Sequence, residues 1–268
     1  MGSRALCIGI NDYPRADADL YGCVNDALDW EALLQARGFK TELLVDRDAT
    51  WQGITDGIAR TIEGAASGDT VVITYSGHGS FIQDLDGDEP DRVDEVFCPH
   101  DIFDDRPLTD DQLYDLFTRA ERDVRIVLIA DSCHSGSVAR MALPLGESDD
   151  LPKERTRFLA PGAWAPRERV ARMRELTAAA RPTRRPHAAL LLAGCQDTQT
   201  SADAYLDGRY NGAFTYYALK ALDGVSADAT YAQWFRKIKE LLPNRRYGQQ
   251  PNLQGSRTQR AWQVFAGS

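Results

Sequence analysis

The sequence lacks long hydrophobic runs, and this absence excludes a helical membrane protein. Its longest apolar stretches are about strand length, far short of the roughly 20 residues that a membrane-spanning helix needs. The start, MGSRALCIGI, passes directly into a strand-like run without the charged, apolar and small-residue regions of a secretory signal. We therefore expect a cytoplasmic protein with no membrane partner.

Cysteines are few, and positive charges are fewer than negative ones, with 31 Lys and Arg against 40 Asp and Glu. Five cysteines, an odd number without close pairs, argue against a disulfide framework. The net charge of −9 disfavours a nucleic-acid partner. The chain has no Cys/His spacing typical of zinc and no glycine-rich phosphate loop. What remains is an ordinary globular composition over 268 residues, with 43% hydrophobic and 26% charged side chains.

Strand-like and helix-like patterns alternate along the chain. Short β-rich apolar runs occupy 4–10, 40–45, 69–76, 125–130, 188–194 and 261–266. Helical periodicity occupies 25–38, 50–65, 109–120, 212–222 and 230–242, with Thr50 and Thr109 at two helix starts. This alternation predicts an α/β fold with a mostly parallel sheet and helices on both faces. We expect one domain over 1–268, with 141–187 as an excursion from it.

Charge is concentrated in two segments of opposite sign. Residues 84–111 carry 12 Asp and Glu against two arginines, a net charge of −10. Residues 151–187 carry 10 Lys and Arg against three glutamates, a net charge of +7. Each segment is explained equally well as a solvated loop or as part of a functional site.

Two of the predicted strands end in segments rich in Ser and Gly, YSGHGS with His78 and DSCHSG with Cys133. Reactive groups of open α/β sheets lie beyond the carboxyl ends of the strands, so neighbouring strands would bring these two side chains together. A thiolate is the nucleophilic form of cysteine, and an adjacent imidazole generates it. A lone Cys at a strand end is usually a small core residue, but the shared setting favours a catalytic pair.

The glycines that flank His78 let the backbone approach a substrate closely. The N–H groups of Gly79 and Cys133 are candidates to bind the oxyanion of a tetrahedral intermediate. Three other histidines are weaker candidates for the base. His134 points elsewhere in an extended chain because it neighbours Cys133, and His100 and His187 lack a comparable setting.

The chain resembles the metacaspases, caspase-like cysteine peptidases of clan CD and family C14, over nearly its whole length. The histidine and cysteine blocks YSGHGS and DSCHSGS stand in metacaspase order, and DSCHSGS departs from the Q-A-C-x-G signature of animal caspases. The other matching blocks are ALCIGINDY, LYGCVNDA, DGDEPDRVDEVFCPHD, LLLAGCQDTQTSADA, NGAFTYYAL and YGQQPNLQG. The resemblance implies a caspase-like three-layer sandwich, a bare catalytic domain of bacterial type and cysteine endopeptidase activity.

The resemblance further implies cleavage of protein or peptide substrates after Arg or Lys at P1, the residue before the scissile bond. A buried guanidinium needs paired carboxylates. By similarity the pocket residues are Cys23, Asp26, Ser76 and Asp131. Alternate residues of a strand share a side, so Asp131 can face the P1 side chain while Cys133 faces the carbonyl. A first-turn acid that favours the helix dipole is the alternative for Asp26.

Many metacaspases need calcium, and Asp94, Asp110 and Asp111 match their ligand positions. Oxygen ligands in an acidic stretch suit this hard cation. A glutamate expected after the nucleophile is Arg140 here, which weakens the expectation. Residues 84–95 imitate an EF-hand but have no glycine at its sixth position, so we reject that motif.

The basic stretch 141–187 lies where caspase-like enzymes process themselves, and its arginines would be substrates of an Arg-specific enzyme. A surface loop that is never cut is the alternative. For the whole chain, the alternatives are a ligand-switched effector protease of a bacterial stress or defence pathway and a catalytically silent scaffold. We expect a monomer.

Overall fold

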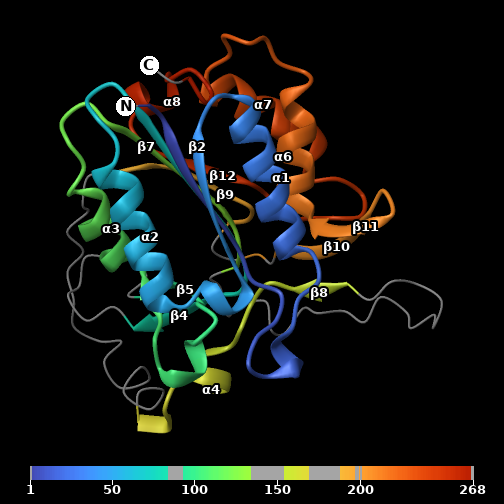
Figure 1. The fold of residues 1–268 in the computed structure, drawn as a ribbon. Helices are drawn as coiled ribbons and strands as arrows, with labels where there is room; N and C mark the ends of the chain where they lie inside the picture. Colours follow the sequence, from blue (N-terminus) through green and yellow to red (C-terminus); the bar gives the residue numbers. More distant parts are fainter. Residues whose placement is uncertain are drawn as a thin grey trace.

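The computed structural model describes residues 2–83, 93–133, 154–168, 188–196, 199 and 201–266 (Figure 1). Its centre is a twisted six-stranded sheet in which every neighbouring pair is parallel except the first, where β12 runs antiparallel to β9. Across the sheet the strands are β12 (Asn252–Gln254), β9 (Leu190–Ala193), β7 (Arg125–Asp131), β3 (Thr70–Ser76), β1 (Arg4–Gly9) and β2 (Lys40–Val45). The predicted mostly parallel sheet is confirmed.

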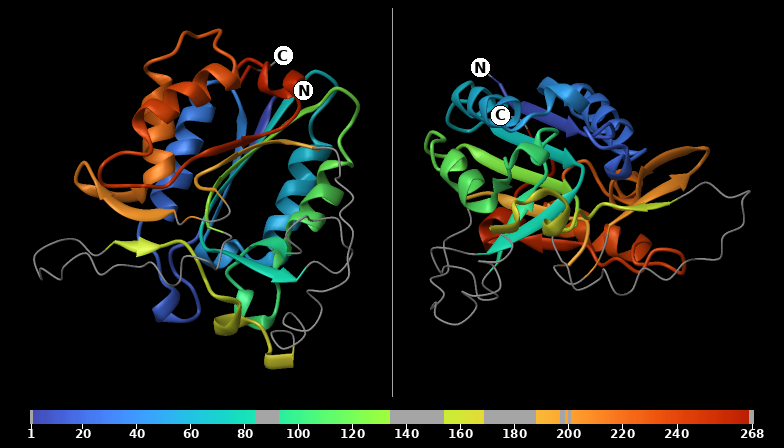
Figure 2. Two further views of the ribbon diagram at one scale, coloured as in Figure 1. Left: turned by 180° about the vertical axis from the view of Figure 1, so that it is seen from behind. Right: turned by 90° about the horizontal axis from the view of Figure 1, so that it is seen from below.

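Helices cover both faces of this sheet (Figures 1 and 2). One face packs against α2 (Trp51–Glu63) and α3 (Asp110–Phe117). The other packs against α1 (Cys23–Ala36), α6 (Ala213–Leu222) and α7 (Tyr231–Leu241). Successive residues of each strand enter opposite cores, because strand side chains alternate between the two faces. The fold is therefore the expected three-layer sandwich.

Local sequence signals account for the helix starts. Thr50 caps α2 by accepting a hydrogen bond from the Gly53 N–H, and Thr109 caps α3 in a reciprocal capping box with Gln112. Helix α7 begins in the same way, with Thr230 as its cap. The predicted helices at 50 and 109 thus begin where expected.

Two small antiparallel sheets lie beyond the carboxyl ends of the central strands (Figure 1). One contains β4 (Gly79–Gln83), β5 (Val93–Phe97) and β6 (Leu108–Thr109). The other contains β8 (Arg155–Thr156), β10 (Ala202–Leu206) and β11 (Arg209–Gly212). Two short helices are α4 (Pro161–Trp164) and α8 (Arg257–Arg260). Strand β8 and α4 belong to the predicted excursion 141–187, whose described part is 154–168.

The predicted final strand at 261–266 is wrong. After α8 the chain turns, and Gln263 forms only an isolated bridge with Thr230. Phe265 has a φ of 51°, which an extended strand does not allow, and its buried ring packs edge-on against Trp30 and Trp234. The apolar residues of this segment thus fill the space above the α1–α7 layer and do not extend the sheet.

Within the described ranges, no helix combines the length and the apolar character needed to cross a membrane.

Candidate active site

The sheet brings His78 and Cys133 to the same end of the molecule. Strands β3 and β7 are parallel neighbours in a register that pairs Ser76 with Asp131, and each candidate residue lies two positions beyond its member of this pair. Both side chains are buried, His78 with 4% of its surface exposed and Cys133 with none. Strands β3 and β7 are therefore neighbours, as the predicted proximity of His78 and Cys133 required.

The environment of His78 fixes its protonation state. Its Nε2 lies 2.7 Å from the carbonyl oxygen of Ala18, which only accepts hydrogen bonds, so Nε2 carries the proton. Nδ1 is therefore a lone-pair nitrogen, and it is buried without a hydrogen-bond partner among the described residues. Burial lowers the pKa of His78 to about 4, so the ring is neutral at physiological pH. A neutral imidazole with an uncommitted nitrogen is able to accept a proton.

The sulfur of Cys133 lies among polar backbone groups. The Ser201 N–H donates a hydrogen bond to Sγ, and the Ser201 carbonyl oxygen is 3.6 Å from the same sulfur. Cys195 is also adjacent, since a hydrogen bond with Cys133, together with burial, raises the pKa of Cys195 well above its ordinary value.

Two backbone N–H groups converge on one oxygen beside Cys133. The Gly79 N–H and the Cys133 N–H both donate to the carbonyl oxygen of Arg157, at N···O distances of 3.0 and 3.2 Å. This is the geometry of an oxyanion hole, and the donors are those that the sequence indicated. A Cβ atom at residue 79 would collide with the Cys133 carbonyl, so glycine is required for this approach.

The side chain of Arg157 fills a pocket of carboxylates next to this oxygen. It is fully buried, with Nη2 at 2.7 Å from Asp26 and 3.0 Å from Asp203, and Nη1 at 3.4 Å from Asp131. Nη1 also donates to the Ser76 hydroxyl and to the Asp131 carbonyl oxygen, at 3.3 and 3.1 Å. Asp26, Ser76 and Asp131, predicted by resemblance to line the P1 pocket, thus surround one guanidinium.

Backbone and side-chain donors hold the carboxylates in place. Asp26 accepts from the Gly212 N–H at 3.0 Å and from the Asn211 amide at 2.9 Å. Asp131 accepts from both the N–H and the hydroxyl of Thr215, at 2.8 and 2.9 Å. Burial nevertheless raises the pKa of Asp26 to about 6, although Arg157 opposes the shift.

Cys23, the fourth residue predicted for the pocket, is the first residue of α1 and is fully buried. It interacts electrostatically with Arg157 and the three carboxylates, and burial raises the pKa of its thiol well above the ordinary value. Cys23 therefore contributes a neutral wall to the pocket.

Sequence reasoning missed two residues of this site, Asp203 and Arg157. Asp203 lies in β10 and accepts from the N–H groups of Tyr21 and Gly22 at 2.7 and 3.0 Å. Its signal was an acid between two alanines in the quoted block ending SADA, and an acid that is buried needs hydrogen-bonding or charged partners. Arg157 had no signal of its own among the other basic residues of its stretch.

The residues proposed for calcium lie on neighbouring elements. Asp94 is buried in β5, and Asp110 and Asp111 open α3 just after the pairing of Thr109 with Val96 of β5. Within the described parts of the chain, however, no three His, Cys, Asp or Glu side chains gather as a metal site. Asp94, Asp110 and Asp111 alone therefore do not form a complete calcium site among the described residues.

Several other sequence candidates fall elsewhere. His100 lies after β5, where its N–H donates to the Ala49 carbonyl at 2.9 Å. Arg140, His134 and His187 lie outside the described residues, as does the acidic segment 84–92.

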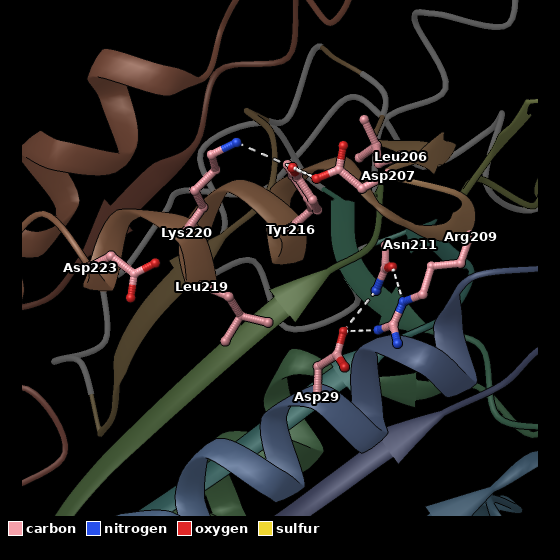
Figure 3. Close-up of a pocket in the computed structure, with 9 residues that line it drawn as sticks. All are labelled: Asp29, Leu206, Asp207, Arg209, Asn211, Tyr216, Leu219, Lys220 and Asp223. Atoms are coloured by element: carbon pink, nitrogen blue, oxygen red, sulfur yellow. Dashed lines mark hydrogen bonds and ion pairs between the residues drawn. The ribbon is translucent and has the colours of Figure 1, made fainter.

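An open hollow lies beside the Arg157 pocket, between α1, the β10–β11 hairpin and α6 (Figure 3). Asn211 separates the two, because its amide donates both to Asp26 of the pocket and to Asp29 of the hollow. In this hollow Arg209 pairs with Asp29, and Tyr216 forms hydrogen bonds with Asp207 and Lys220. The hollow is therefore distinct from the space that Arg157 fills.

Solved structures place this architecture in a known class. The structure superposes on caspase-1 of Spodoptera frugiperda with a TM-score of 0.56 and 11% identity, covering 94% of this chain and 86% of that one. A protein of Geobacter sulfurreducens gives a TM-score of 0.72 at 29% identity, with 98% of each chain covered. The chain thus has the caspase-like fold.

Sequence comparison identifies the family. A model of the metacaspase, peptidase C14 domain matches residues 3–142. Metacaspase-1 of Pyricularia oryzae is 30% identical, with 98% of this chain and 74% of that protein covered. Metacaspase-1A of Neurospora crassa is 32% identical, covering 94% and 62% of the two chains. The chain belongs to the metacaspase family, and it spans 62% of the length of this Neurospora relative.

Proposed function

We propose that the protein is a cysteine endopeptidase that cleaves protein or peptide substrates after Arg, and less efficiently after Lys. The observation that carries this proposal is the position of Arg157. Its carbonyl oxygen accepts from Gly79 and Cys133, while its guanidinium pairs with Asp26, Asp131 and Asp203. A P1 arginine of a bound substrate would make the same two sets of contacts.

In this mechanism Cys133 is the nucleophile and His78 the base. Nδ1 of His78 accepts the thiol proton, while the Ala18 carbonyl keeps the other ring nitrogen protonated. The Gly79 and Cys133 N–H groups stabilise the negative charge that develops on the substrate carbonyl oxygen. His78 then returns the proton to the departing amine.

The pocket favours Arg over Lys at P1. Both terminal nitrogens of the guanidinium have acidic partners, whereas its Nε has none among the described residues. A lysine offers one ammonium group to partners that are arranged around two nitrogens.

A peptide library that varies only P1 tests the proposal with matched variants. Cys133→Ala should abolish cleavage and His78→Ala should nearly do so, because the two groups act as a unit. Cys7→Ala, at a buried cysteine of β1, and His100→Gln should retain activity. Cleavage by Cys133→Ala at the wild-type rate, or efficient cleavage after Asp with Arg peptides untouched, would contradict the assignment.

We further propose that calcium binds weakly near Asp94, Asp110 and Asp111. Two observations support calcium binding: β5 and α3 are neighbours, and residues 84–111 contain 12 Asp and Glu. Two measurements test calcium binding. One is calorimetric titration of Cys133→Ala with calcium, and the other is the activity of the wild type in calcium and in chelator. We expect binding at the weak end of the micromolar-to-millimolar range. Equal activity in chelator and no binding heat would remove calcium from the proposal.

A further inference from the structure

Residues 155–159 bind across the site as an extended chain. Strand β8 pairs antiparallel with β10, matching Thr156 with Ala202 and Arg155 with Asp203. The ladder continues where the Arg157 N–H donates to the Ser201 carbonyl at 3.1 Å. Beyond Arg157, the Leu159 N–H donates to the Gly79 carbonyl at 2.9 Å. An added strand of this kind is a common way for a protein to hold a peptide.

Side chains on both sides of Arg157 also contact the enzyme. The guanidinium of Arg155 lies 4.7 Å above the ring of Tyr21. The ring of Phe158 is nearly parallel to that of Phe81, with centroids 6.2 Å apart. The segment is therefore held before and after the Arg157 carbonyl, as a substrate is held around its scissile bond.

We propose that residues 155–159 are an internal substrate, and that Arg157–Phe158 is the bond that this protein cleaves in its own chain. Until it is cut, the segment excludes other substrates from the pocket. This inference rests on the proposed peptidase function and adds the bond, the segment and the resulting latency. It also indicates the substrate class, an extended peptide with Arg at P1 and an aromatic residue after the scissile bond.

The reaction follows from the groups in place. Cys133 Sγ forms a bond to the carbonyl carbon of Arg157 as the thiol proton moves to His78. The C–N bond to Phe158 breaks, and His78 gives that proton to the departing amine, which leaves a thioester. One water molecule hydrolyses the thioester and yields the Arg157 carboxyl group and the free Cys133 thiol. No other reactant is needed.

The charges in the pocket favour departure of the segment after the cut. Three carboxylates face one guanidinium, so the pocket already carries excess negative charge. Cleavage creates a further carboxylate at the backbone end of Arg157, in the same buried site as these groups, and like charges in a buried site repel. Before cleavage the same carbonyl is neutral, so the uncut segment binds without that repulsion.

Mass spectrometry and N-terminal sequencing of purified protein test the bond. The wild type should yield a fragment that begins at Phe158, and Arg157→Lys should still yield it. Arg157→Gln should remain uncut at this position. Arg167→Gln, which removes an exposed arginine of the same stretch, should be cut like the wild type. An intact 157–158 bond in a wild type that cleaves Arg peptides overturns the inference and leaves the proposed function standing.

A binding measurement tests the latency without any cleavage. The probe is a fluorescent peptide of the sequence ERTRFLA, residues 154–160. Cys133→Ala/Arg157→Gln should bind it at least about tenfold more tightly than Cys133→Ala, because apparent affinity scales with the open fraction. Cys133→Ala/Arg167→Gln should bind it as weakly as Cys133→Ala. Equal affinity in all three proteins overturns the latency. A wild type that cuts neither peptides nor itself overturns both proposals.

Discussion

Asp203 has two tasks in the site. It pairs with Nη2 of Arg157, and it also accepts from the N–H groups of Tyr21 and Gly22, just before α1. In the proposed mechanism the first contact binds the P1 side chain, whereas the second holds the loop before α1. An asparagine at this position keeps an oxygen for the loop and removes the charge, so the two tasks can be separated by one substitution.

We expect Asp203→Asn to lower kcat/KM for peptides with Arg at P1 by about 100-fold or more, since breaking a buried ion pair costs roughly 3 kcal/mol. The loss should appear mainly in KM. Asp207→Asn, at an exposed acid of the same hairpin, is the control and should cleave like the wild type. If Asp203→Asn is as active as the wild type while Asp131→Asn is impaired, Asp203 serves only the loop.

The lowered pKa of His78 also predicts how the free energy of unfolding depends on pH. Its folded-state pKa of about 4 is below the ordinary 6.5, so the unfolded chain binds more protons between these values. This contribution therefore lowers the free energy of unfolding as pH falls from about 6.5 to about 4, by on the order of 3 kcal/mol. Asp26, with its raised pKa, acts in the opposite direction as pH falls below about 6.

Urea unfolding of Cys133→Ala at several pH values, beside Cys133→Ala/His78→Gln, isolates the histidine, because Asp26 is common to both proteins. The stability difference between them should change by the stated amount over this window. Parallel curves across the window would mean that His78 is not held neutral in the folded protein.

At the scale of elements, the start of β4 positions both halves of the site. Gly79 donates to the Arg157 carbonyl and accepts from the Leu159 N–H, and its Cα faces the Cys133 carbonyl. We expect Gly79→Ala to reduce kcat by roughly 100-fold or more, the usual cost of losing an oxyanion donor. Gly162→Ala in α4 meets open space and should leave kcat unchanged. Wild-type kcat in Gly79→Ala would remove this N–H from the mechanism.

The sequence was informative about long elements and uninformative about short ones. Strands such as β3 and β7 have continuous apolar runs, because helices cover both faces, and threonine caps mark where α2 and α3 begin. Strand β8 has only two residues and depends on pairing with β10, so the sequence shows no hydrophobic periodicity that predicts it. The segment 261–266, wrongly predicted as a strand, has strand-like composition, but Phe265 packs against Trp30 and Trp234 and the segment does not pair with the central sheet.

The same limit explains the site residues. His78 and Cys133 follow recognisable strands, so their proximity followed from topology once β3 and β7 were neighbours. Arg157 is distinguished from Arg155 and Arg167 only by a tertiary pocket whose acids come from distant parts of the chain. Such a convergence is a property of the folded molecule, and one sequence does not display it.

The internal substrate is tethered to its own site, so self-cleavage should be intramolecular. We expect the rate constant for appearance of the new N-terminus at Phe158 to be independent of protein concentration over about a hundredfold dilution. Intermolecular cleavage would instead slow in proportion to the dilution. Wild type mixed with Cys133→Ala should leave the latter uncut, because its Arg157 is buried in its own pocket. A rate proportional to concentration would contradict this expectation.

Removal of β8 also changes what β10 presents to other molecules. In the uncut chain β10 has a hydrogen-bonded partner on each side, β11 and β8. Once residues 155–156 leave, one row of its N–H and C=O groups is unpaired. Open strand edges recruit other chains, whether a passing peptide or a second copy of the same protein. The cut that opens the pocket to substrates would therefore also expose an edge that favours association with other chains, and an intact β8 would prevent this association.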